Sequence, residues 1–464
     1  MDSALLEKIL YRAEDLGCKF ADIRYQRRES EIIQVDNGTL QSYSSDTFSG
    51  IGVRVVYGGS IGFASNCDTS ERSLNKTLEF AVKSARAQIS GEEEPFSTIP
   101  LTKADVSLKM KSKPLDVSPE EKVSLAVEAN KAAFIDDSIK TSYTRIGFIH
   151  NFKHFMSLDG AEIKVRIPLI GLGHQSVASR NGVKEVVSDS ISRCSGWELL
   201  EETDWNIFTE ELSRHAMKAV AAKSAPSGTF PVIVHHEVIG LVLHEALGHA
   251  CEGDAVISNA SILRDKRGKR IADEQVTVND EGIIDGGYYH PYDDEGVEKG
   301  RTVVIKEGVL KTFLTDRKNA KKLGVDSTGN GRLQDFENFP IVRQTNFYMD
   351  AGDYSLDELF EGIDYGIYIK GKGGKGGQVD PSGTFTFGVG PSIIIRNGEP
   401  EELVRGVVIS GNILDTMESI DAVGKDFKVK TSVFGGCGKG GQLVKTGMGG
   451  PTVRAQKMTV GGRA

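Results

Sequence analysis

The segment from His244 to Asp254 reads H-E-A-L-G-H-A-C-E-G-D and combines two histidines with a glutamate, directly after an apolar run. Neutral imidazole is the commonest protein ligand for metal ions. A glutamate beside such ligands can act as the general base for a water molecule at the metal. The segment therefore predicts a catalytic metal site with His244 and His249 as ligands and Glu245 as the base.

The spacing of these histidines departs from the zinc-protease motif H-E-x-x-H, in which they are four residues apart. Here they are five apart, and a regular α-helix at about 100° per residue would point them about 140° away from each other. A π-bulge adds one residue to a turn and is frequent at functional sites. The sequence thus predicts a widened turn at 246–248, or a helix that ends there. The alternative is a hydrogen-bonded core histidine at His244 and a capping residue at His249.

A catalytic zinc usually has three protein ligands and one open position, so the two histidines need a partner. Cys251 and Glu252 lie close behind them, but Cys251 also fits a small buried thiol and Glu252 a supporting role. Asp254 could instead cap the structure that follows. Cys437 is remote, yet the glycines around it could form a sharp turn that presents a thiolate, which a cation such as Lys439 would favour. The residues alone leave these candidates open.

Other polar clusters are less suited to this chemistry. His235 and His236 stand in a run, 231–238, with the pattern of a β-strand, whose successive side chains face opposite sides. We therefore expect them to be structural or to face substrate. The acidic residues 293–295 do not fit an EF-hand and predict a turn. The glycine-rich loops at 371–380 and 433–442 both contain Lys-Gly-Gly-Gln, but they lack the pattern of a phosphate-binding loop.

Composition limits the class of protein. A length of 464 residues allows two or three domains. The net charge of −9, from 56 basic and 65 acidic residues, disfavours binding to nucleic acid or to an anionic membrane. The five cysteines follow no regular spacing, which favours a reducing compartment. Neither a signal peptide nor an apolar stretch of roughly 20 residues is present. We expect a cytoplasmic, soluble protein.

The elements that must position the motif fall into two groups, and together they predict an α+β fold. Residues 1–225 are expected to form an N-terminal helix-and-hairpin domain, and residues 226–464 a β-rich, barrel-like C-terminal domain that carries the metal-motif helix. A linker is expected at 91–114. Helical periodicity, capping signals and Asn-Gly pairs place the N-terminal elements: helices at 3–16, from Asp68 to about Ala87, at 119–134 and at 204–222, and hairpin turns at 37–38, 58–59 and 181–182.

The motif resembles the signature of a known protein family. H-E-A-L-G-H-A-C-E-G-D is similar to the modified H-E-x-x-x-H signature of the TldD subunit of the TldD/PmbA (TldE) metalloproteases. The N-terminal half resembles the family more loosely, in its order of helices and hairpins. Further segments between residues 230 and 464 resemble family blocks in the same order: Tyr292–Gly296, Pro340–Asn346, Lys375–Asp380, Ile420–Gly424, Gly436–Lys439 and Pro451–Thr452.

The resemblance implies a metal, zinc or iron, on His244, His249 and Cys437, with Glu245 as the catalytic glutamate. It thereby favours Cys437 over the nearer candidates. Because the PmbA-type partner subunits lack the metal motif, the chain resembles the active subunit.

The resemblance also implies a protease that acts on unfolded or disordered peptides in extended form. Such a protein would work as a homodimer, or as a heterodimer with a PmbA/TldE-type subunit. Two other functions remain open from the residues. One is a non-enzymatic peptide-binding or scaffolding subunit, with a structural metal closed by Cys251 or Glu252. The other is a metal-dependent hydrolase of small amides.

Overall fold

The computed structural model describes residues 1–88, 95–372 and 376–462. The predicted linker at 91–114 and the motif that begins at Lys375 are therefore described only in part, since residues 91–94 and Lys375 lie outside the described residues. The α+β class is confirmed, because helices and extended sheets occur in both halves of the chain. In the described part of the chain, no helix combines the length and apolar character needed to cross a membrane.

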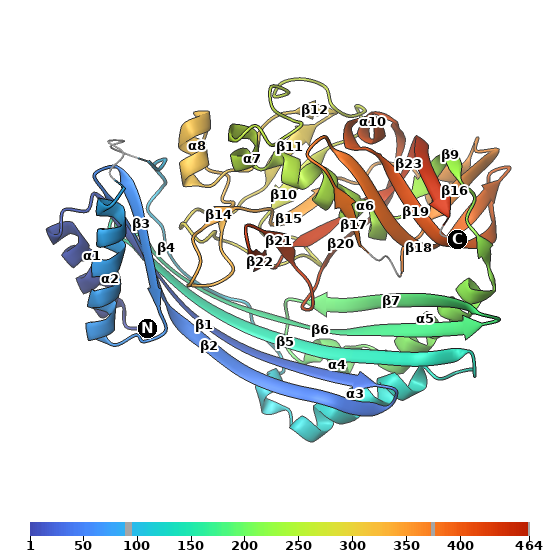
Figure 1. Ribbon diagram of the computed structural model, residues 1–464, viewed down its shortest axis with the longest axis horizontal. Helices are drawn as coiled ribbons and strands as arrows, with labels where there is room; N and C mark the ends of the chain where they lie inside the picture. Colours follow the sequence, from blue (N-terminus) through green and yellow to red (C-terminus); the bar gives the residue numbers. More distant parts are fainter. Residues whose placement is uncertain (89–94, 373–375, 463–464) are drawn as a thin grey trace.

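The N-terminal half is built on one curved sheet of seven strands (Figure 1). Its strand order is β3-β2-β1-β5-β6-β4, with β7 also paired to β6, and the pairing of β4 with β6 is parallel. The strands are β1 Phe20–Asp36, β2 Thr39–Tyr57, β3 Ser60–Asn66, β4 Lys103–Ser107, β5 Ile139–Ser157, β6 Glu162–Arg180 and β7 Val183–Arg193. Asn37 and Gly38 have positive φ angles of 47° and 76°, so they close the first hairpin as a two-residue turn.

Strand alternation assigns one face of this sheet to helices and the other to the C-terminal half. On β1, Ile23 packs with α1 and α2, and Ile33 and Val35 pack near α3, so the odd-numbered residues face helices. The even-numbered residues face the opposite side, where the C-terminal half lies over the concave surface (Figure 1). The N-terminal helices are α1 Ser3–Asp15, α2 Glu71–Arg86, η1 Pro114–Asp116, α3 Pro119–Ala132, α4 Glu198–Glu202 and α5 Trp205–Ala221.

The C-terminal half is organised around a sheet of twelve strands. Its order is β12-β11-β10-β15-β23-β9-β16-β18-β19-β8, with β17 on β18 and β20 on β23. Strand β19 also pairs with β23, so the strands β23, β9, β16, β18 and β19 form a closed ring of pairings. The twelve strands of this sheet are β8 Lys223–Ser224, β9 Gly228–Val234, β10 Val278–Glu281, β11 Thr302–Lys306, β12 Val309–Leu310, β15 Asn346–Met349, β16 Tyr365–Ile369, β17 Gly376–Val379, β18 Thr384–Arg396, β19 Glu399–Asn412, β20 Ile420–Thr431 and β23 Gly447–Gly462. Two small hairpins stand apart from it, namely β13 Gly331–Arg332 with β14 Ile341–Val342, and β21 Cys437–Lys439 with β22 Gln442–Val444.

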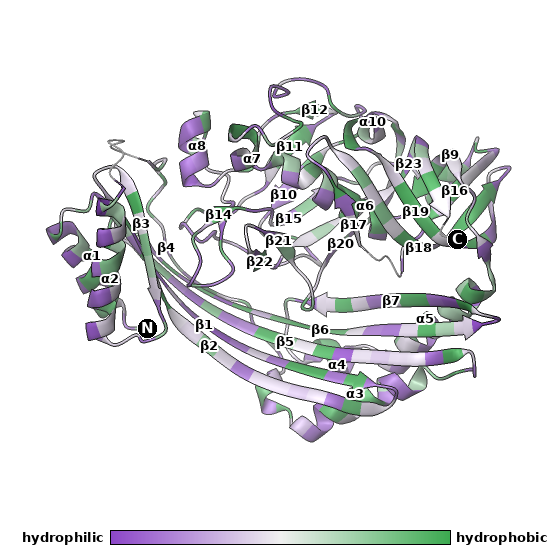
Figure 2. Ribbon diagram, viewed as in Figure 1, coloured by the Kyte–Doolittle hydropathy of each residue, from purple (hydrophilic) through white to green (hydrophobic). Residues whose placement is uncertain are grey.

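The helix that carries the histidine motif is buried against this sheet. A Cβ atom on Gly240 would lie 2.7 Å from the backbone nitrogen of Gly449 on β23, so the helix packs directly on strand backbone. Figure 2 shows hydrophobic residues concentrated in the strands around it and a hydrophilic surface helix at α8. The C-terminal helices are α6 His236–Val242, η2 Leu243–Gly248, η3 His249–Cys251, α7 Gly253–Ile257, α8 Arg317–Leu323, α9 Leu356–Phe360 and α10 Ile413–Glu418.

Buried charges join the two halves. The guanidinium of Arg54 on β2 is fully buried and binds both Asp22 of β1 and Glu295 of the C-terminal half. The acidic segment 293–295 forms a turn, as predicted, in which Asp293 accepts hydrogen bonds from the backbone of Glu295 and Val297. Arg54 therefore links the N-terminal sheet to the C-terminal half, and removal of either carboxylate would leave part of a buried charge unpaired.

Several local predictions differ from the structure. Helix α2 begins at Glu71 with Ser70 as its N-cap, because Asp68 instead accepts hydrogen bonds from Ser70 and Ser73 in the preceding turn. Strand β4 lies inside the predicted linker and pairs with β6. The sequence analysis also did not predict helices α4, α7 and α8. The expected domain boundary between residues 225 and 226 stays a prediction.

Candidate metal centre

The motif helix contains the widened turn that the histidine spacing predicts. Residues Leu243–Gly248 form a π-helix that continues α6 without a break and passes into a short 3-10 helix, His249–Cys251. The extra residue rotates His249 back towards His244, and their ring centroids are 5.3 Å apart. The prediction of a distorted turn at 246–248 is confirmed.

The thiol of Cys437 meets the two imidazoles from a distant part of the chain. One ligand atom each from His244, His249 and Cys437 lies within 4.8 Å of the others. The Cys437 Sγ is 3.3 Å from His249 Nε2. The structure therefore brings together the three side chains that the family resemblance implies as metal ligands.

The chemistry of these donors fits a metal ion. His244 is fully buried, and neither of its ring nitrogens has a hydrogen-bond partner among the described residues. A buried polar atom without a partner costs about 1–3 kcal/mol, and a metal bond would remove that cost for the nitrogen that makes it. Two imidazole nitrogens and one thiolate form a donor set that suits zinc or iron.

The electrostatics of the cluster favour the ligand form of the thiol. Burial opposes ionisation of Cys437, but its hydrogen bond with His249 and the nearby imidazole of His244 lower its pKa to about 5. Burial likewise lowers the pKa of His249, yet hydrogen bonds to Cys437 and Glu252 raise it to about 10. Without a metal, the pair is thus an imidazolium beside a thiolate, and a metal ion can replace the shared proton.

The second ring nitrogen of His249 is held by a buried carboxylate. His249 Nδ1 lies 3.1 Å from Glu252 Oε2, and the side chain of Glu252 is only 1% exposed. Lys439, two residues after Cys437, donates to Glu252 at 2.8 Å and to Asp254 at 2.7 Å. The positive charge of Lys439 is therefore neutralised by the carboxylates of Glu252 and Asp254. The contact ties the hairpin that carries the thiol to the segment that carries the histidines.

Two buried residues that sequence reasoning missed also support the site. Arg343 donates to the backbone carbonyls of Cys437 and Gln442, so it holds the β21–β22 hairpin. Gln344 donates to the backbone carbonyl of His244 at 3.0 Å. Both belong to the segment Pro340–Asn346, one of the segments that carry the family resemblance, which was the only sequence signal for them.

Glu245 lies on the accessible side of the cluster. Its Oε2 is 4.0 Å from His249 Nε2, the nitrogen that also faces Cys437. Its side chain is 40% exposed, whereas that of His249 is 27% exposed. The carboxylate can therefore reach a water molecule or a substrate group that approaches the three donor atoms.

The other candidates for a third ligand have different partners. Cys251 is fully buried in the hydrophobic core of the C-terminal half, and burial raises the pKa of its thiol. Glu252 binds the far nitrogen of His249, and Asp254 binds Lys439. Among the described residues, none of the three joins the cluster of donor atoms.

The prediction of a strand through residue 238 is wrong. Strand β9 ends at Val234, and the side chain of His235 accepts a hydrogen bond from the backbone of Glu237, which turns the chain into helix α6. The rings of His235 and His236 are 3.8 Å apart and line a separate cavity of about 550 Å³.

Comparison with known proteins places these observations in a wider group. The PmbA/TldA metallopeptidase domain 1 matches residues 21–87, and the central domain of the same description matches residues 112–221. The PmbA/TldA metallopeptidase C-terminal domain matches residues 227–462, which contain the whole donor cluster.

Individual relatives are similar over nearly the whole chain. A protein named metalloprotease from Methanothermobacter thermautotrophicus is 35% identical, with 100% of this chain and 99% of the relative covered. A protein named zinc metalloprotease TldD homolog from Saccharolobus solfataricus is 33% identical, with 98% and 99% covered. The solved structure of TldE from Thermococcus kodakarensis has a TM-score of 0.80 at 19% identity, covers 99% and 100%, and shows the shared fold.

Proposed function

The chain belongs to the TldD/PmbA family of metallopeptidases, and from this premise we propose that it hydrolyses peptide bonds in unfolded or disordered peptides. The metal ion, zinc or iron, is held by His244, His249 and Cys437. The convergence of these three donors beside Glu245 is the observation that carries the proposal.

Each protein group has a defined task in this reaction. The ion, when bound, supplies a Lewis acid that polarises the scissile carbonyl and acidifies a water molecule. Glu245 takes the proton from the attacking water and then returns it to the leaving amine, because its carboxylate lies on the open side of the cluster. Glu252 orients His249 through Nδ1 and leaves Nε2 directed at the donor cluster.

The accessibility of the site supports an extended peptide as the substrate. His244 and Cys437 are buried, whereas His249 and Glu245 are partly exposed, so the donor cluster opens to solvent on the side of His249 and Glu245. A single extended chain fits such an approach better than a folded domain does. A closed structural metal site is less well supported, since Cys251 and Glu252, the residues that could close it, have other partners.

We also propose that the enzyme acts in the cytoplasm as a dimer, either with a second copy or with a PmbA/TldE-type subunit. The family membership supports this assembly. Light scattering of the purified chain, alone and mixed with such a subunit, tests it. A chain that is fully active as a monomer would contradict it.

The test of the function is Glu245→Gln. We expect the metal to be retained and peptide cleavage to fall by about 10²–10⁴-fold, the usual contribution of a general base. Glu274→Gln, at an exposed glutamate, is the matched control and should cleave like the unaltered protein. Retained cleavage would remove Glu245 from the mechanism. Loss of metal would make it a ligand instead. Cleavage of small amides but not of disordered peptides would contradict the proposed substrate class.

A further inference from the structure

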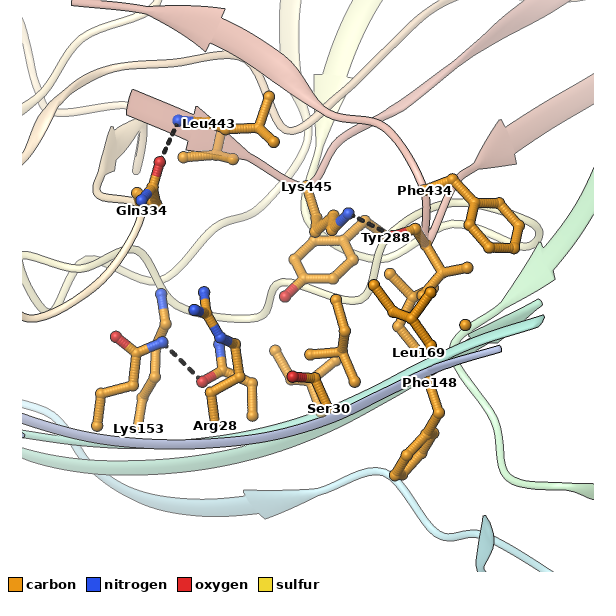
Figure 3. Close-up of a pocket in the computed structure, with 18 of the residues that line it drawn as sticks. Arg28, Ser30, Phe148, Lys153, Leu169, Tyr288, Gln334, Phe434, Leu443 and Lys445 are labelled. Atoms are coloured by element: carbon orange, nitrogen blue, oxygen red, sulfur yellow. Dashed lines mark hydrogen bonds between the residues drawn. The ribbon is translucent and has the colours of Figure 1, made fainter. Parts of the chain in front are cut away.

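A second cavity, of about 370 Å³, lies between the concave face of the N-terminal sheet and the C-terminal half. Figure 3 shows Arg28, Ser30 and Lys153 rising from the sheet, with Tyr288, Phe434 and Lys445 approaching from the other side. The cavity is therefore built by both halves of the molecule, and neither half encloses it alone.

The floor of this cavity follows from strand register. Alternate residues of β1 lie on one face of the sheet, and the antiparallel pairing with β5 places alternate residues of β5 beside them on the same face. Arg28 stands opposite Asn151, and Gln34 stands opposite Arg145. The floor residues on this face of the two strands are Gln26, Arg28, Ser30, Ile32 and Gln34 on β1, and Arg145, Gly147, Ile149, Asn151 and Lys153 on β5.

The wall of the cavity is the segment that carries the thiol. Val433 and Phe434 line it just before Cys437, and Val444 lines it directly opposite Cys437 in the β21–β22 pairing. Lys445 follows and donates to the backbone carbonyl of Val433 at 2.7 Å. A ligand in the cavity therefore lies against the same hairpin that presents Cys437 to the histidines.

The charges that line the cavity are all positive. Five arginine and lysine side chains line it, and no aspartate or glutamate is among its lining residues. Lys153 is neutralised by Asp294 at 2.6 Å. Arg332 is 3% exposed and donates to the backbone carbonyls of Gln344 and Lys445, but its Nε has no hydrogen-bond partner among the described residues.

Three of these cations have no carboxylate partner among the described residues. They are Arg28, Arg145 and Lys445, and the two arginines instead stack on Phe48 and Phe434 respectively. All three line the same cavity, and burial together with the charges of Arg28 and Arg145 lowers the pKa of Lys445 to about 8. Like charges that are gathered without a counter-charge are unfavourable unless an anion joins them.

We propose that this cavity binds a carboxylate of the peptide substrate, so that the enzyme selects peptides with an acidic side chain or a free C-terminus near the cleaved bond. The inference rests on the proposed function. A peptide suits the cavity because its lining also contains apolar groups, among them Leu169 and Phe434, which can pack against side chains. Arginine is well matched to a carboxylate, since its guanidinium can donate two parallel hydrogen bonds.

The experiment uses four disordered peptides of one length. They carry either Glu or Gln at one position and either a free or an amidated C-terminus, so the two sources of a carboxylate are separated. The kcat/KM of each peptide is measured with the unaltered protein and with Arg145→Gln and Arg28→Gln. Arg27→Gln is the matched control, because Arg27 is the neighbour of Arg28, lies on the opposite face of β1 and has an exposed side chain.

We expect the unaltered protein to prefer at least one carboxylate-bearing peptide by about tenfold, the value of one charge-assisted hydrogen bond. The preference should fall towards one in Arg145→Gln and Arg28→Gln and should persist in Arg27→Gln. If one variant fails to fold, the other decides. Equal cleavage of all four peptides, or a preference that survives in the folded variants, would overturn the inference while leaving the proposed function intact.

A failure of the proposed function is distinguished by a binding measurement. Fluorescence anisotropy of the same four peptides with Glu245→Gln reports binding without cleavage. If no peptide is cleaved but this protein binds the carboxylate-bearing peptides more tightly, the cavity assignment stands and the enzymatic function does not. If it binds all four equally, the cavity assignment is overturned as well.

Discussion

The buried carboxylate of Glu252 offers the sharpest test of how the metal centre is held. It accepts from His249 Nδ1 at 3.1 Å and from Lys439 at 2.8 Å, and it is almost fully buried. The variant Glu252→Gln keeps the size of the side chain and an oxygen that can accept the Nδ1 proton. Lys439 still has Asp254 at 2.7 Å, so its charge remains paired. The variant therefore removes mainly the negative charge beside the ring.

The size of the effect follows from this arrangement. A carboxylate on the far nitrogen orients a metal-binding imidazole and makes it a better donor, and loss of such a partner typically costs 10–100-fold in metal affinity. This range corresponds to about 1.4–2.7 kcal/mol. Because Glu252 is buried, solvent and salt screen the interaction little, so we expect a value within the range. The metal-free protein should lose stability as well, because its His249 imidazolium then lacks the negative charge of Glu252.

The assay is competition for zinc with a chelator of known affinity, together with thermal unfolding of the metal-free proteins. Asp254→Asn is the matched control, because Asp254 shares Lys439 but does not contact His249, and its side chain is 30% exposed. Its zinc affinity should change by less than about threefold. Unchanged affinity in Glu252→Gln would refute the reasoning. An equal loss of zinc affinity in both variants would show that the effect comes from the ion pairs of Lys439 with Glu252 and Asp254, and not from the contact with the imidazole of His249.

Two further predictions concern the same turn and its thiol. Gly248→Ala should destabilise the protein by about 1–3 kcal/mol in chemical denaturation, because a Cβ atom there would lie 2.1 Å from the buried side-chain amide of Gln344, which binds the backbone of His244. The control is Gly300→Ala, where the added atom meets open space, and it should leave the stability unchanged. In the metal-free protein the Cys437 thiol should stay ionised down to about pH 5, because the effect of the two histidines on its pKa outweighs the effect of burial. The ultraviolet absorbance of the thiolate, followed against pH, measures this ionisation. Because an unfolded cysteine has a pKa of about 8.5, ionisation of Cys437 stabilises the fold fully above that pH, and this contribution is lost as the pH falls to about 5. It is measured as the difference in free energy of unfolding between the unaltered protein and Cys437→Ala. A difference that does not change with pH would contradict the prediction.

Most elements of the N-terminal half could be predicted because their signals are local. Ser118 caps helix α3 by accepting from the backbone of Glu121, three residues later, as the Ser-Pro-Glu-Glu pattern indicates. Asn37 and Gly38 adopt the positive φ angles of a two-residue hairpin. The widened turn at the histidines is also predictable, since it depends only on the geometry of one helix.

The approach of Cys437 could not be derived in the same way. It depends on how the β21–β22 hairpin, which follows β20, stands apart from the twelve-stranded sheet, and on Arg343, which binds the carbonyls of Cys437 and Gln442 from another segment. Spacing alone leaves Cys251 open as a candidate beside Cys437, and only family resemblance favours Cys437 clearly. The cationic cavity is harder still, because its floor and wall come from different halves of the chain.

The ring of His249 shows how two local departures from a regular helix act together. Before it, the π turn at Leu243–Gly248 adds the residue that rotates Nε2 towards Cys437. After it, the 3-10 turn ends at Cys251, and Glu252 adopts an extended conformation with ψ of 125°. That change of direction lets the side chain of Glu252 return to Nδ1 instead of continuing around the helix. The two irregularities therefore fix opposite nitrogens of one ring. A regular helix through the same residues would release both contacts at once, which is why we interpret the irregular backbone as part of the site.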